Sequence, residues 1–412
     1  MLKTQLLLTE GELAQYRKRW QILANLVEGT RMPMWKKPGP DKPDRNLLKK
    51  LPENNADLED ALYECFLMAK RGKSDTVDEW NFETFWKENL QQLTKDIIKR
   101  RWKPGRSKAF VTHTPVDREI FAAWFRDRVV HHLLYAVVAP WWDKRFIYDS
   151  YSCRRNKGTD FGAERMQKFM RQVSRNGTRK AYVMKGDLSG YFMSLNRKKL
   201  YQKVMWGLKR QFPDRGWLYK LCAYLWREVI YDDPCTGAKM AGHPSDWDCL
   251  PHNKSLFHQP KGRGIVIGNL TSQLLSNIML NEFDWWMFKK MGFKHYGRYV
   301  DDFYIIVTEE ERELAFNMMH HEIPEKLRTL GLKMHPKKLY CQEVSHGCPF
   351  LGKMVRPFVL TPGKRYLKNM RKAFRDYVEG RGTYETMQSY VGMGQHVASH
   401  AAMKKVVDRL AV

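Results

Sequence analysis

The sequence lacks any apolar run long enough to cross a membrane. An apolar stretch such as Val129–Pro140 is interrupted by His131 and His132, and it is shorter than the roughly 20 residues that a spanning helix needs. The N-terminal residues Met1–Leu13 contain only a brief apolar run and no small-residue cleavage site, which does not fit a signal peptide. We therefore expect no membrane association.

Acidic residues and paired cysteines are also scarce. The 412 residues include 45 Asp and Glu against 72 Lys and Arg, which gives a net charge of +27. Because this excess is spread along the chain and is not held in a tail, we expect a polyanionic partner, with nucleic acid as the first candidate. The seven cysteines are odd in number and scattered, as is typical of reduced thiols in the cytoplasm.

Apolar periodicity and breaker residues predict a mixture of helices and short strands. Period-two alternation predicts a strand at Arg179–Gly186 and a β-hairpin at Tyr296–Val307, and a short strand is predicted at Ala109–Thr114. Helices are predicted at Glu10–Glu28, Asp57–Arg71, Asn81–Arg101, Asp117–Pro140, Arg197–Tyr231, Ser272–Met291 and Glu309–Leu330, and from Thr361 onward the chain is expected to be basic and helical.

Two adjacent aspartates stand within the predicted hairpin, in the run Tyr299-Val300-Asp301-Asp302-Phe303. Charged side chains are costly in a buried strand, so we expect the pair at the hairpin tip, between packed apolar flanks. Because side chains alternate across a strand, Asp301 and Asp302 are expected to point to opposite sides, one toward a metal and the other beside it. An ordinary polar β-turn would also explain the pair taken alone.

A second acidic turn, at Asp187, follows the predicted strand Arg179–Gly186. Two Mg²⁺ ions held roughly 4 Å apart need carboxylates from more than one chain segment. The sequence therefore predicts that Asp187 meets Asp301 and Asp302 in space, as a centre for phosphodiester bond formation. Asp is common in turns, so the prediction depends on the combination of the two segments.

The order of these segments, from about Arg106 to the end, resembles that of reverse transcriptases, whose most specific motif is the Tyr-Val-Asp-Asp box. The resemblance implies a right-hand polymerase of the α+β class, with fingers, a palm built on an antiparallel sheet and a helical thumb. It also implies that Asp187 and Asp301 bind metal, that Asp302 is the third acid, and that the carbonyl of Leu188 contacts metal.

The segment Gly264–Gln273 is similar to the next block of the family. Most reverse transcriptases have Gln-Gly-x-x-x-Ser-Pro there, whereas this chain has Ile267-Gly268-x-x-x-Ser272-Gln273. This departure, together with neighbouring runs such as Asp127–His132, resembles the reverse transcriptases of diversity-generating retroelements of bacteria and phages.

The resemblance places Phe192, Ile267, Gly268, Arg118 and Lys338 at the incoming nucleotide. Phe192 is expected to exclude a ribose 2′-hydroxyl and so to select dNTPs, unless it is simply a core residue. Because the side chain of Ile267 has no hydrogen-bonding group, we expect looser checking of the new base pair, with errors at template adenines. Arg118 suits a triphosphate, and Lys338 is expected to protonate pyrophosphate; a surface arginine and a solvated lysine are the alternatives.

Further residues are expected to hold the template and primer. Arg154, Arg155 and Lys157 lie in a fingers segment that we expect to meet template phosphates. Gln273 is counted with them because it ends the altered family block. Phe350-Leu351-Gly352 resembles the primer-grip hairpin, in which backbone groups hold the primer end.

Five residues of one loop, Cys235, His243, Cys249, His252 and His258, suggest a zinc site at first sight. Their spacing lacks the paired Cys-x-x-Cys pattern of a structural zinc site. We therefore expect no zinc in this loop.

The expected domains follow from the same resemblance. Residues 1–101 are assigned to an N-terminal helical extension and the start of the fingers, and residues 102–186 to the fingers. Residues 187–355 are assigned to the palm, with an inserted fingers segment near 200–264. Residues 356–412 are assigned to a basic helical thumb.

The resemblance implies an RNA-directed DNA polymerase that copies a template-repeat RNA into cDNA for mutagenic retrohoming into a variable target gene. Expected partners are template RNA, the RNA–cDNA hybrid, dNTPs, two Mg²⁺ ions and a small basic pentameric accessory protein, in the cytoplasm of a bacterial host. Two alternatives remain open. One is a reverse transcriptase of another bacterial lineage, defence-associated or retron-type, and the other is a non-catalytic RNA-binding protein on a polymerase scaffold.

Overall fold

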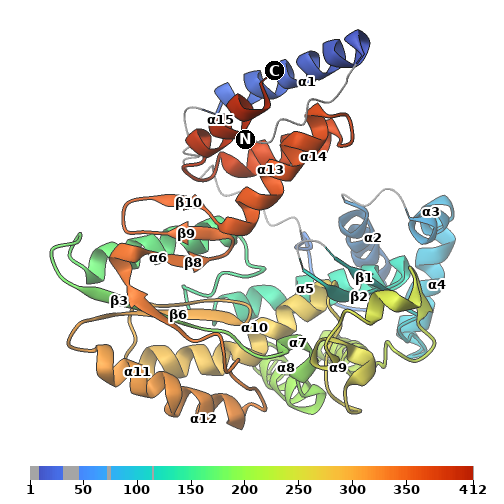
Figure 1. The fold of residues 1–412 in the computed structure, drawn as a ribbon. Helices are drawn as coiled ribbons and strands as arrows, with labels where there is room; N and C mark the ends of the chain where they lie inside the picture. Colours follow the sequence, from blue (N-terminus) through green and yellow to red (C-terminus); the bar gives the residue numbers. More distant parts are fainter. Residues whose placement is uncertain (1–8, 31–45, 72–75, 114–115, 412) are drawn as a thin grey trace.

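The computed structural model describes residues 9–30, 46–71, 76–113 and 116–411. Figure 1 shows three groups of elements: a sheet covered by helices, a helical group with a smaller sheet beside it, and a helical group that stands above both. Within the described ranges, no helix combines the length and apolar character that a bilayer span requires.

The central sheet has four antiparallel strands in the order β5-β6-β3-β7. They are β3 (Ala181–Gly186), β5 (Tyr296–Tyr299), β6 (Asp302–Thr308) and β7 (Tyr340–Glu343). Successive side chains of a strand point to opposite faces of a sheet. Because β3 and β6 have apolar residues at successive positions, both faces of this sheet are apolar. Val183 and Ile306 pack with residues of α6 (Thr159–Val173), whereas Met184 and Ile305 belong to the main core on the other face. The predicted strand and hairpin are confirmed.

The main core is built around two helices that are buried on almost every side, α5 (Phe125–Asp143) and α10 (Leu270–Trp285). Apolar residues lie on most sides of both helices, and several of the polar residues among them, such as Asp127, His131 and Asp284, are themselves buried. The surrounding helices are α2 (Asp57–Lys70), α3 (Val77–Thr84), α4 (Trp86–Ile98), α7 (Tyr191–Ser194), α8 (Arg197–Gln211), α9 (Trp217–Tyr231), α11 (Arg312–His320) and α12 (Glu322–Thr329).

Three predicted helices are each divided in the structure. The helix expected at Arg197–Tyr231 is α8 and α9, with a break between Gln211 and Trp217. The helix expected at Asn81–Arg101 is α3 and α4, with a break at Phe85, whose φ of −121° and ψ of 43° are not helical. The helix expected at Glu309–Leu330 is α11 and α12, with a break at His321. In the last two cases the apolar periodicity continues across a short break, so the pattern alone shows one helix.

A smaller sheet with the order β2-β1-β4 contains β1 (Lys108–Thr112), β2 (Arg118–Ala122) and β4 (Lys239–Met240). The prediction of one helix at Asp117–Pro140 is therefore wrong at its start, because β2 precedes α5. The reason lies in tertiary contacts. The buried carboxylate of Glu119 accepts hydrogen bonds from the indole of Trp247, the hydroxyl of Ser255 and the backbone of Leu256, which fixes this segment as a strand against a distant loop.

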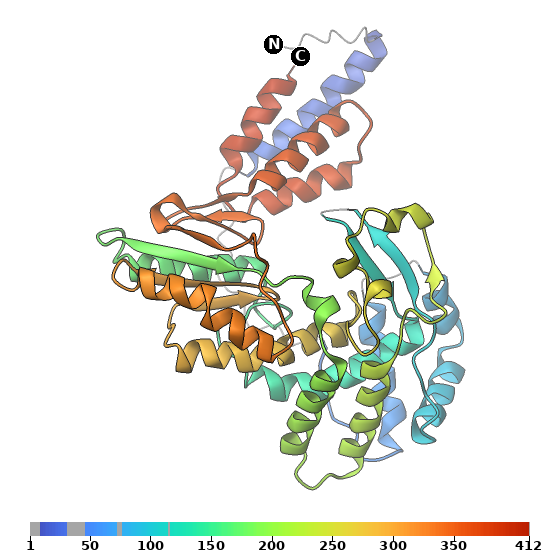
Figure 2. The ribbon, with the colours of Figure 1, turned by 60° about the horizontal axis from the view of Figure 1, so that its bottom comes forward.

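The third group contains the C-terminal helices α13 (Lys364–Val378), α14 (Tyr384–Gly394) and α15 (His400–Leu410). Helix α1 (Glu10–Glu28) packs among them (Figures 1 and 2), and Leu23 and Val27 share a core with Met370 and Phe374. The indole of Trp20 donates to the carbonyl of Val407 over 3.0 Å. Helix α1 is thus part of the C-terminal helical group.

A three-stranded antiparallel sheet joins this group to the central sheet. Its order is β10-β9-β8, with β8 (Cys348–Phe350), β9 (Lys353–Val355) and β10 (Leu360–Pro362). Strand β3 lies inside the central sheet, between β6 and β7. Our boundary at residue 187 assigned β3 to the fingers, and the pairing corrects this: β3 belongs to the palm sheet.

Candidate active site

The pairing of β3 with β6 brings the two acidic turns together. Gly186 is paired with Phe303 in this antiparallel ladder, so one further step along both strands sets Asp187 opposite Asp302. Residues directly opposite in such a ladder have Cα atoms about 4.5–5.5 Å apart. The predicted meeting of the acidic residues is therefore what the strand register produces.

Asp301 lies in the tight loop that joins β5 to β6. Tyr299 is paired with Asp302, which leaves only Val300 and Asp301 in the turn. Val300 has a φ of 56°, a conformation that is rare for a β-branched residue. Its backbone is held on both sides: the guanidinium of Arg298 donates to its carbonyl over 2.8 Å, and its N–H donates to the hydroxyl of Ser152 over 3.2 Å.

A buried ion pair supports this turn from below. Arg298 of β5 and Asp284 of α10 are joined by contacts of 2.6 and 2.7 Å, and their side chains are 1% and 0% exposed. The hydroxyl of Tyr296 donates to the same carboxylate over 2.7 Å. Asn277 links the network to Ser152 by donating to its carbonyl over 2.9 Å.

The sequence analysis missed this network. One signal was present: Arg298 and Asp284 are charged residues at inward positions of otherwise apolar elements. Since buried charges are almost always paired, two such residues in neighbouring elements predict each other.

The acidic residues raise one another's proton affinity. Burial raises the pKa of Asp301 to about 6, and the neighbouring charges of Asp187 and Asp302 add to this. Burial also raises the pKa of Asp302 to about 6, although the ammonium of Lys185, 3.1 Å from Oδ2, opposes the rise. Both shifts follow from crowding carboxylates in a poorly solvated place.

The donor set fits a hard divalent cation. Oδ1 of Asp302 is buried and has no hydrogen-bond partner among the described residues, and Asp301 lies close enough to Asp187 for their charges to interact. Clustered carboxylates whose repulsion a cation would relieve are the oxygen ligands that Mg²⁺ prefers. We expected Asp301 and Asp302 to face opposite sides, yet the pKa of each is raised by the charge of Asp187.

Lys338 approaches this centre from the turn before β7. Its ammonium lies 2.6 Å from Oδ2 of Asp187, and its side chain is 55% exposed. The N–H of His335 donates to the carbonyl of Asp187 over 2.8 Å. Lys338 is thus brought to the acidic site although it lies more than 150 residues after Asp187 in the chain. A triphosphate or pyrophosphate bound at this site would be within reach of its ammonium.

The residues after Asp187 form a sharp turn into α7. The buried side chain of Leu188 faces the core, and its backbone is bridged to Met334. Gly190 has a φ of 53°, and a Cβ there would lie 2.6 Å from the carbonyl of Asn253, so only glycine fits. Phe192 is partly buried against the main core. The contact of the Leu188 carbonyl with a metal stays a prediction.

The altered family block lies directly beside Phe192. The N–H of Ile265 donates to the carbonyl of Phe192 over 3.0 Å, and the N–H of Phe121 donates to that of Ile267 over 3.4 Å. The side chain of Ile267 packs partly against a small apolar cluster that includes Phe121. Gly268 has a φ of 120° and is exposed. This block therefore connects the smaller sheet to the acidic site.

Arg118 and Gln273 flank the same region. Arg118 is exposed at the start of β2. Burial raises the pKa of Tyr299, and the charge of Arg118 opposes the rise, so the guanidinium lies within electrostatic reach of the catalytic hairpin. Gln273 is partly exposed in the first turn of α10. The structure is consistent with nucleotide and template positions for these two residues, which stay predictions.

The three residues expected to contact the template differ in how exposed their side chains are. Arg154 must be corrected: its side chain is only 7% exposed, and its guanidinium is held by Asp143 and by the carbonyls of Ile147 and Ser150. Arg154 braces this loop and has no free face for a phosphate. Arg155 is exposed. Burial and the nearby Arg154 charge lower the pKa of Lys157 to about 8.

The predicted primer-grip residues form the turn between β8 and β9. Leu351 and Gly352 have φ values of 50° and 80°, as a two-residue hairpin loop of the mirror-image type requires. The ring of Phe350 is 1% exposed and packs edge-on against Tyr304, 5.2 Å between centroids. Contact with a primer would thus come from the backbone of this turn, as the sequence analysis expected.

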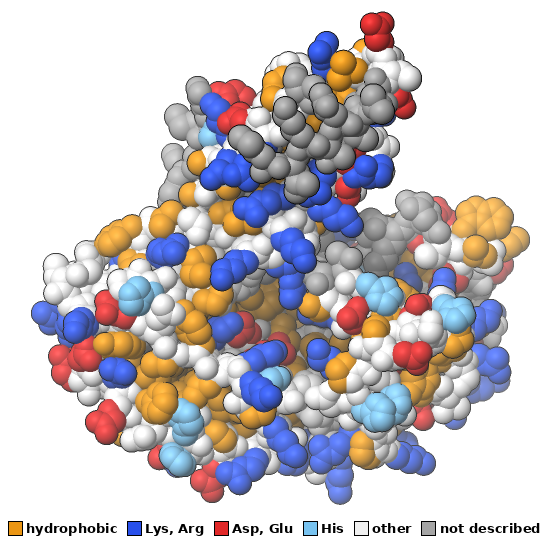
Figure 3. Space-filling model, viewed as in Figure 1, with side chains coloured by type: hydrophobic (Ala, Val, Ile, Leu, Met, Phe, Trp, Pro, Cys, Tyr) orange, Lys and Arg blue, Asp and Glu red, His pale blue; other side chains and the backbone are white. Residues whose placement is uncertain are grey.

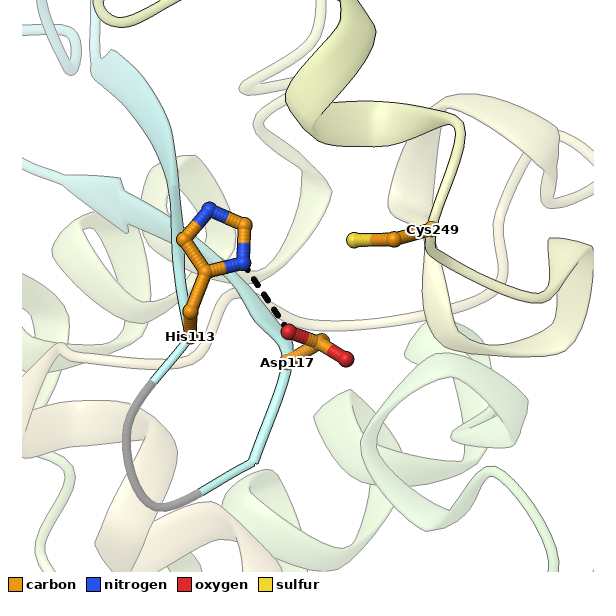
Figure 4. A group of neighbouring side chains, drawn as sticks. All are labelled: His113, Asp117 and Cys249. Atoms are coloured by element: carbon orange, nitrogen blue, oxygen red, sulfur yellow. Dashed lines mark hydrogen bonds and ion pairs between the residues drawn. The ribbon is translucent and has the colours of Figure 1, made fainter. Parts of the chain in front are cut away.

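The five Cys and His residues of the 232–264 loop do not gather into a metal site among the described residues. Among the described residues, the group of side chains that could hold a metal ion is His113, Asp117 and Cys249, of which only Cys249 belongs to this loop (Figure 4). Its side chains are exposed, and the imidazole of His113 lies 2.9 Å from Oδ1 of Asp117. Desolvation and nearby acids raise the pKa of the Cys249 thiol, which disfavours the thiolate that zinc needs.

Comparison with known proteins gives the family. The family described as reverse transcriptase (RNA-dependent DNA polymerase) matches residues 121–355, which are more than half of the chain and include Asp187, Asp301 and Asp302. The chain belongs to this family. The match confirms the expected α+β fold with antiparallel sheets, and members of this reverse transcriptase family generally use divalent metal ions.

Individual relatives of this reverse transcriptase are distant. Protein YkfC of Escherichia coli (strain K12) is 27% identical over 165 residues, which cover 40% of this chain and 36% of YkfC. Telomerase from Candida albicans, solved in complex with a TWJ fragment of telomeric RNA, has 12% identity and a TM-score of 0.44, over 78% of this chain and 61% of the telomerase. Apo telomerase from Candida tropicalis has 12% identity and a TM-score of 0.41, over 79% and 62%. The chain thus spans about a third of YkfC and about three fifths of each telomerase.

Proposed function

We propose that this reverse transcriptase is an active RNA-directed DNA polymerase, which adds dNTPs to a primer 3′-hydroxyl on an RNA template. The observation that supports it most directly is the meeting of Asp187, Asp301 and Asp302 at the ends of paired strands. Three carboxylates crowded at the ends of paired strands, two of them with a raised pKa, are costly for folding alone, and a catalytic role would explain their arrangement.

The residues around the acids suit the reaction. Bound Mg²⁺ ions, two in this proposal, would activate the primer hydroxyl and neutralise the phosphates. Lys338 lies beside Asp187 and could donate a proton to pyrophosphate. In this proposal, Arg118, whose charge acts on Tyr299, would bind the triphosphate, and Phe192 would exclude a ribose 2′-hydroxyl.

The hollow between the three groups of elements offers a place for the template and primer. Figure 3 shows this hollow at the centre of one face, with Lys and Arg side chains around its rim. The net charge of +27 would favour a nucleic acid there through phosphate contacts.

Primer extension tests the proposal. The purified protein should extend a DNA primer on an RNA template with dNTPs and Mg²⁺, and Asp301→Asn should reduce the rate by at least about 10³-fold, as loss of an essential catalytic group does. Binding of the template–primer should persist in the variant. Extension by Asp301→Asn at the wild-type rate, or no extension by either protein with the accessory protein supplied, would reject the catalytic role.

We further propose that the enzyme belongs to the diversity-generating retroelement subgroup, in the cytoplasm of a bacterial host. The altered block at Ile267–Gln273 and the resemblance of the surrounding runs support this proposal. The enzyme would then copy a template-repeat RNA into cDNA with frequent errors at adenines, for retrohoming into a variable target gene. A small basic pentameric protein would act as its accessory partner.

Sequencing of the cDNA tests this finer proposal. Copies of a defined RNA should contain errors concentrated opposite template adenines, with few errors opposite the other three bases. An even spread of errors would remove the enzyme from this subgroup and leave the polymerase proposal intact.

A further inference from the structure

A surface far from the acidic site combines aromatic rings with basic side chains. It lies where the end of α5, the middle of α8 and the end of α10 meet. Helix α8 is at the end of the molecule opposite the thumb (Figures 1 and 2). We call this surface the tryptophan band and define it by Trp141, Arg145, Trp206, Arg210, Trp285 and Phe288.

The band is continuous because each member contacts the next. The rings of Trp206 and Trp141 lie 6.1 Å apart. The guanidinium of Arg145 lies 3.3 Å above the centroid of Trp141, and the indole N–H of Trp285 donates to the carbonyl of Arg145 over 2.8 Å. The chain of contacts ends with Phe288, 6.1 Å from Trp285.

Cations sit on these rings and around them. Arg210 lies 4.0 Å from the centroid of Trp206, and Lys289 lies 4.9 Å from that of Trp285. Such cation–π pairs help to hold the rings in place. Trp206 is 45% exposed and Phe288 is 43% exposed, so large aromatic side chains of the band reach solvent beside the cations, and a contiguous patch of this kind is typical of a binding surface.

The tryptophan band carries a positive charge that acidic side chains of the described residues do not neutralise. The nearby acids are already engaged: Asp143 with Arg154, and Glu282 with Lys203 and Lys326. By contrast, the exposed side chains of Lys144, Lys289, Lys290 and Arg210 form no ion pair with a described residue. Helix α8 itself contains six basic and no acidic residues.

From these observations we infer that the tryptophan band is a second RNA-binding site, outside the catalytic hollow, which takes an unpaired RNA segment. Exposed rings offer stacking faces for bases, and the interleaved cations match a phosphate backbone. A protein partner would need acidic groups opposite these cations. Unlike RNA, it would have no bases to stack on the exposed rings. Trp206 and Arg210 lie on α8, which carries none of the residues assigned to the acidic site or to the template, so RNA bound there would leave the template path open.

Fluorescence anisotropy with the full chain tests the inference. The probe is a labelled oligouridine of about 15 nucleotides, within the length range of single-strand sites. The catalytic hollow is first saturated with an unlabelled RNA–DNA hybrid. The oligouridine should still bind, and the double variant Lys289→Glu/Lys290→Glu should weaken this binding at least about tenfold and flatten its salt dependence, since each lost phosphate contact removes about 0.7 from the log–log slope.

The matched control is Lys95→Glu/Lys99→Glu, which makes the same charge change at an exposed position of α4 and at the exposed residue that follows this helix. It should bind the oligouridine like wild type. Trp206→Ala should weaken binding about fivefold or more, as loss of one stacked base does, and thermal melting of each variant reports that it is folded. No residual binding after the hollow is saturated, equal binding by both double variants, or tighter binding of polyglutamate than of RNA would each overturn the inference.

Discussion

The catalytic turn and the altered family block are held very differently. The turn at Val300 and Asp301 is fixed by Arg298, by Ser152 and by a buried ion pair beneath it. The block at 265–268 is held mainly by two backbone hydrogen bonds, one of them 3.4 Å long, and by partial packing of Ile267.

This difference suggests a division of labour. The geometry of the acids must be precise because bond formation depends on sub-ångström placement, and a buried, fully bonded support provides that. In our proposal, Ile267 makes only apolar contact with the new base pair and forms no hydrogen bond to it. A side chain that is held less firmly is sufficient for such a contact. The four predictions below test this comparison, beginning with the largest expected effect.

Removal of Arg298 should damage the turn most. In Arg298→Met, the carboxylate of Asp284 stays buried without its partner, and loss of one member of a buried pair costs about 3–5 kcal/mol in the free energy of unfolding. Chemical denaturation measures this loss. The double variant Arg298→Met/Asp284→Leu should recover part of the stability but not the extension rate, because the carbonyl of Val300 still lacks its donor. Full recovery of the rate would show that Arg298 acts only on stability.

Asp302→Asn should stabilise the metal-free protein in a pH-dependent way. The pKa of Asp302 is raised to about 6 in the folded protein, above its value of about 3.9 in the unfolded chain. The carboxyl therefore favours folding while protonated, and this contribution is lost as the pH rises through about 6.

Thermal melting without metal measures this effect. The Asn variant should melt a few degrees higher than wild type near pH 8, and the two proteins should agree below about pH 4. Added Mg²⁺ should raise the melting temperature of wild type and not that of the variant. A variant that melts lower near pH 8 would mean that the Lys185 contact outweighs the crowding of the acids.

Ile267→Gln should change copying without changing stability. Its side chain is partly exposed, so a polar replacement needs no burial. One net hydrogen bond near the new base pair is worth about 0.5–1.5 kcal/mol, which corresponds to a fall of about two- to tenfold in errors at template adenines. Sequencing of cDNA from both proteins measures it, with an unchanged melting temperature as control. The same error spectrum in both proteins would remove Ile267 from fidelity control.

Val300→Gly should have the smallest effect. Valine at a φ of 56° costs roughly 1–3 kcal/mol, and glycine relieves this strain at an entropic cost of about 0.5–1 kcal/mol, while the packing of Val300 against the main core is lost. We expect the free energy of unfolding to change by less than about 1 kcal/mol and extension to continue near the wild-type rate. Loss of extension in a folded variant would show that the valine side chain itself takes part.

Much of the palm was predictable because its signals are local. Alternating apolar residues gave β3 and the β5–β6 hairpin, and two acidic residues between apolar flanks placed Asp301 and Asp302 at its tip. The helix expected at Asp117–Pro140 failed at its start because the burial of Glu119 depends on residues 128–137 positions further along the chain. The template contact expected of Arg154 failed because its guanidinium is bound by its own loop.

By itself, the sequence determined which residues stand on which side of each strand and helix, because that depends on neighbours a few positions apart. The position of the acidic turn and the identity of the altered block at Ile267 could therefore be read from the sequence. Only the tertiary structure decided that Lys338 contacts Asp187, that Arg298 pairs with Asp284 beneath the turn, and that α1 packs with the C-terminal helices. These contacts depend on the register of paired strands and on the packing of distant helices, which no local pattern specifies.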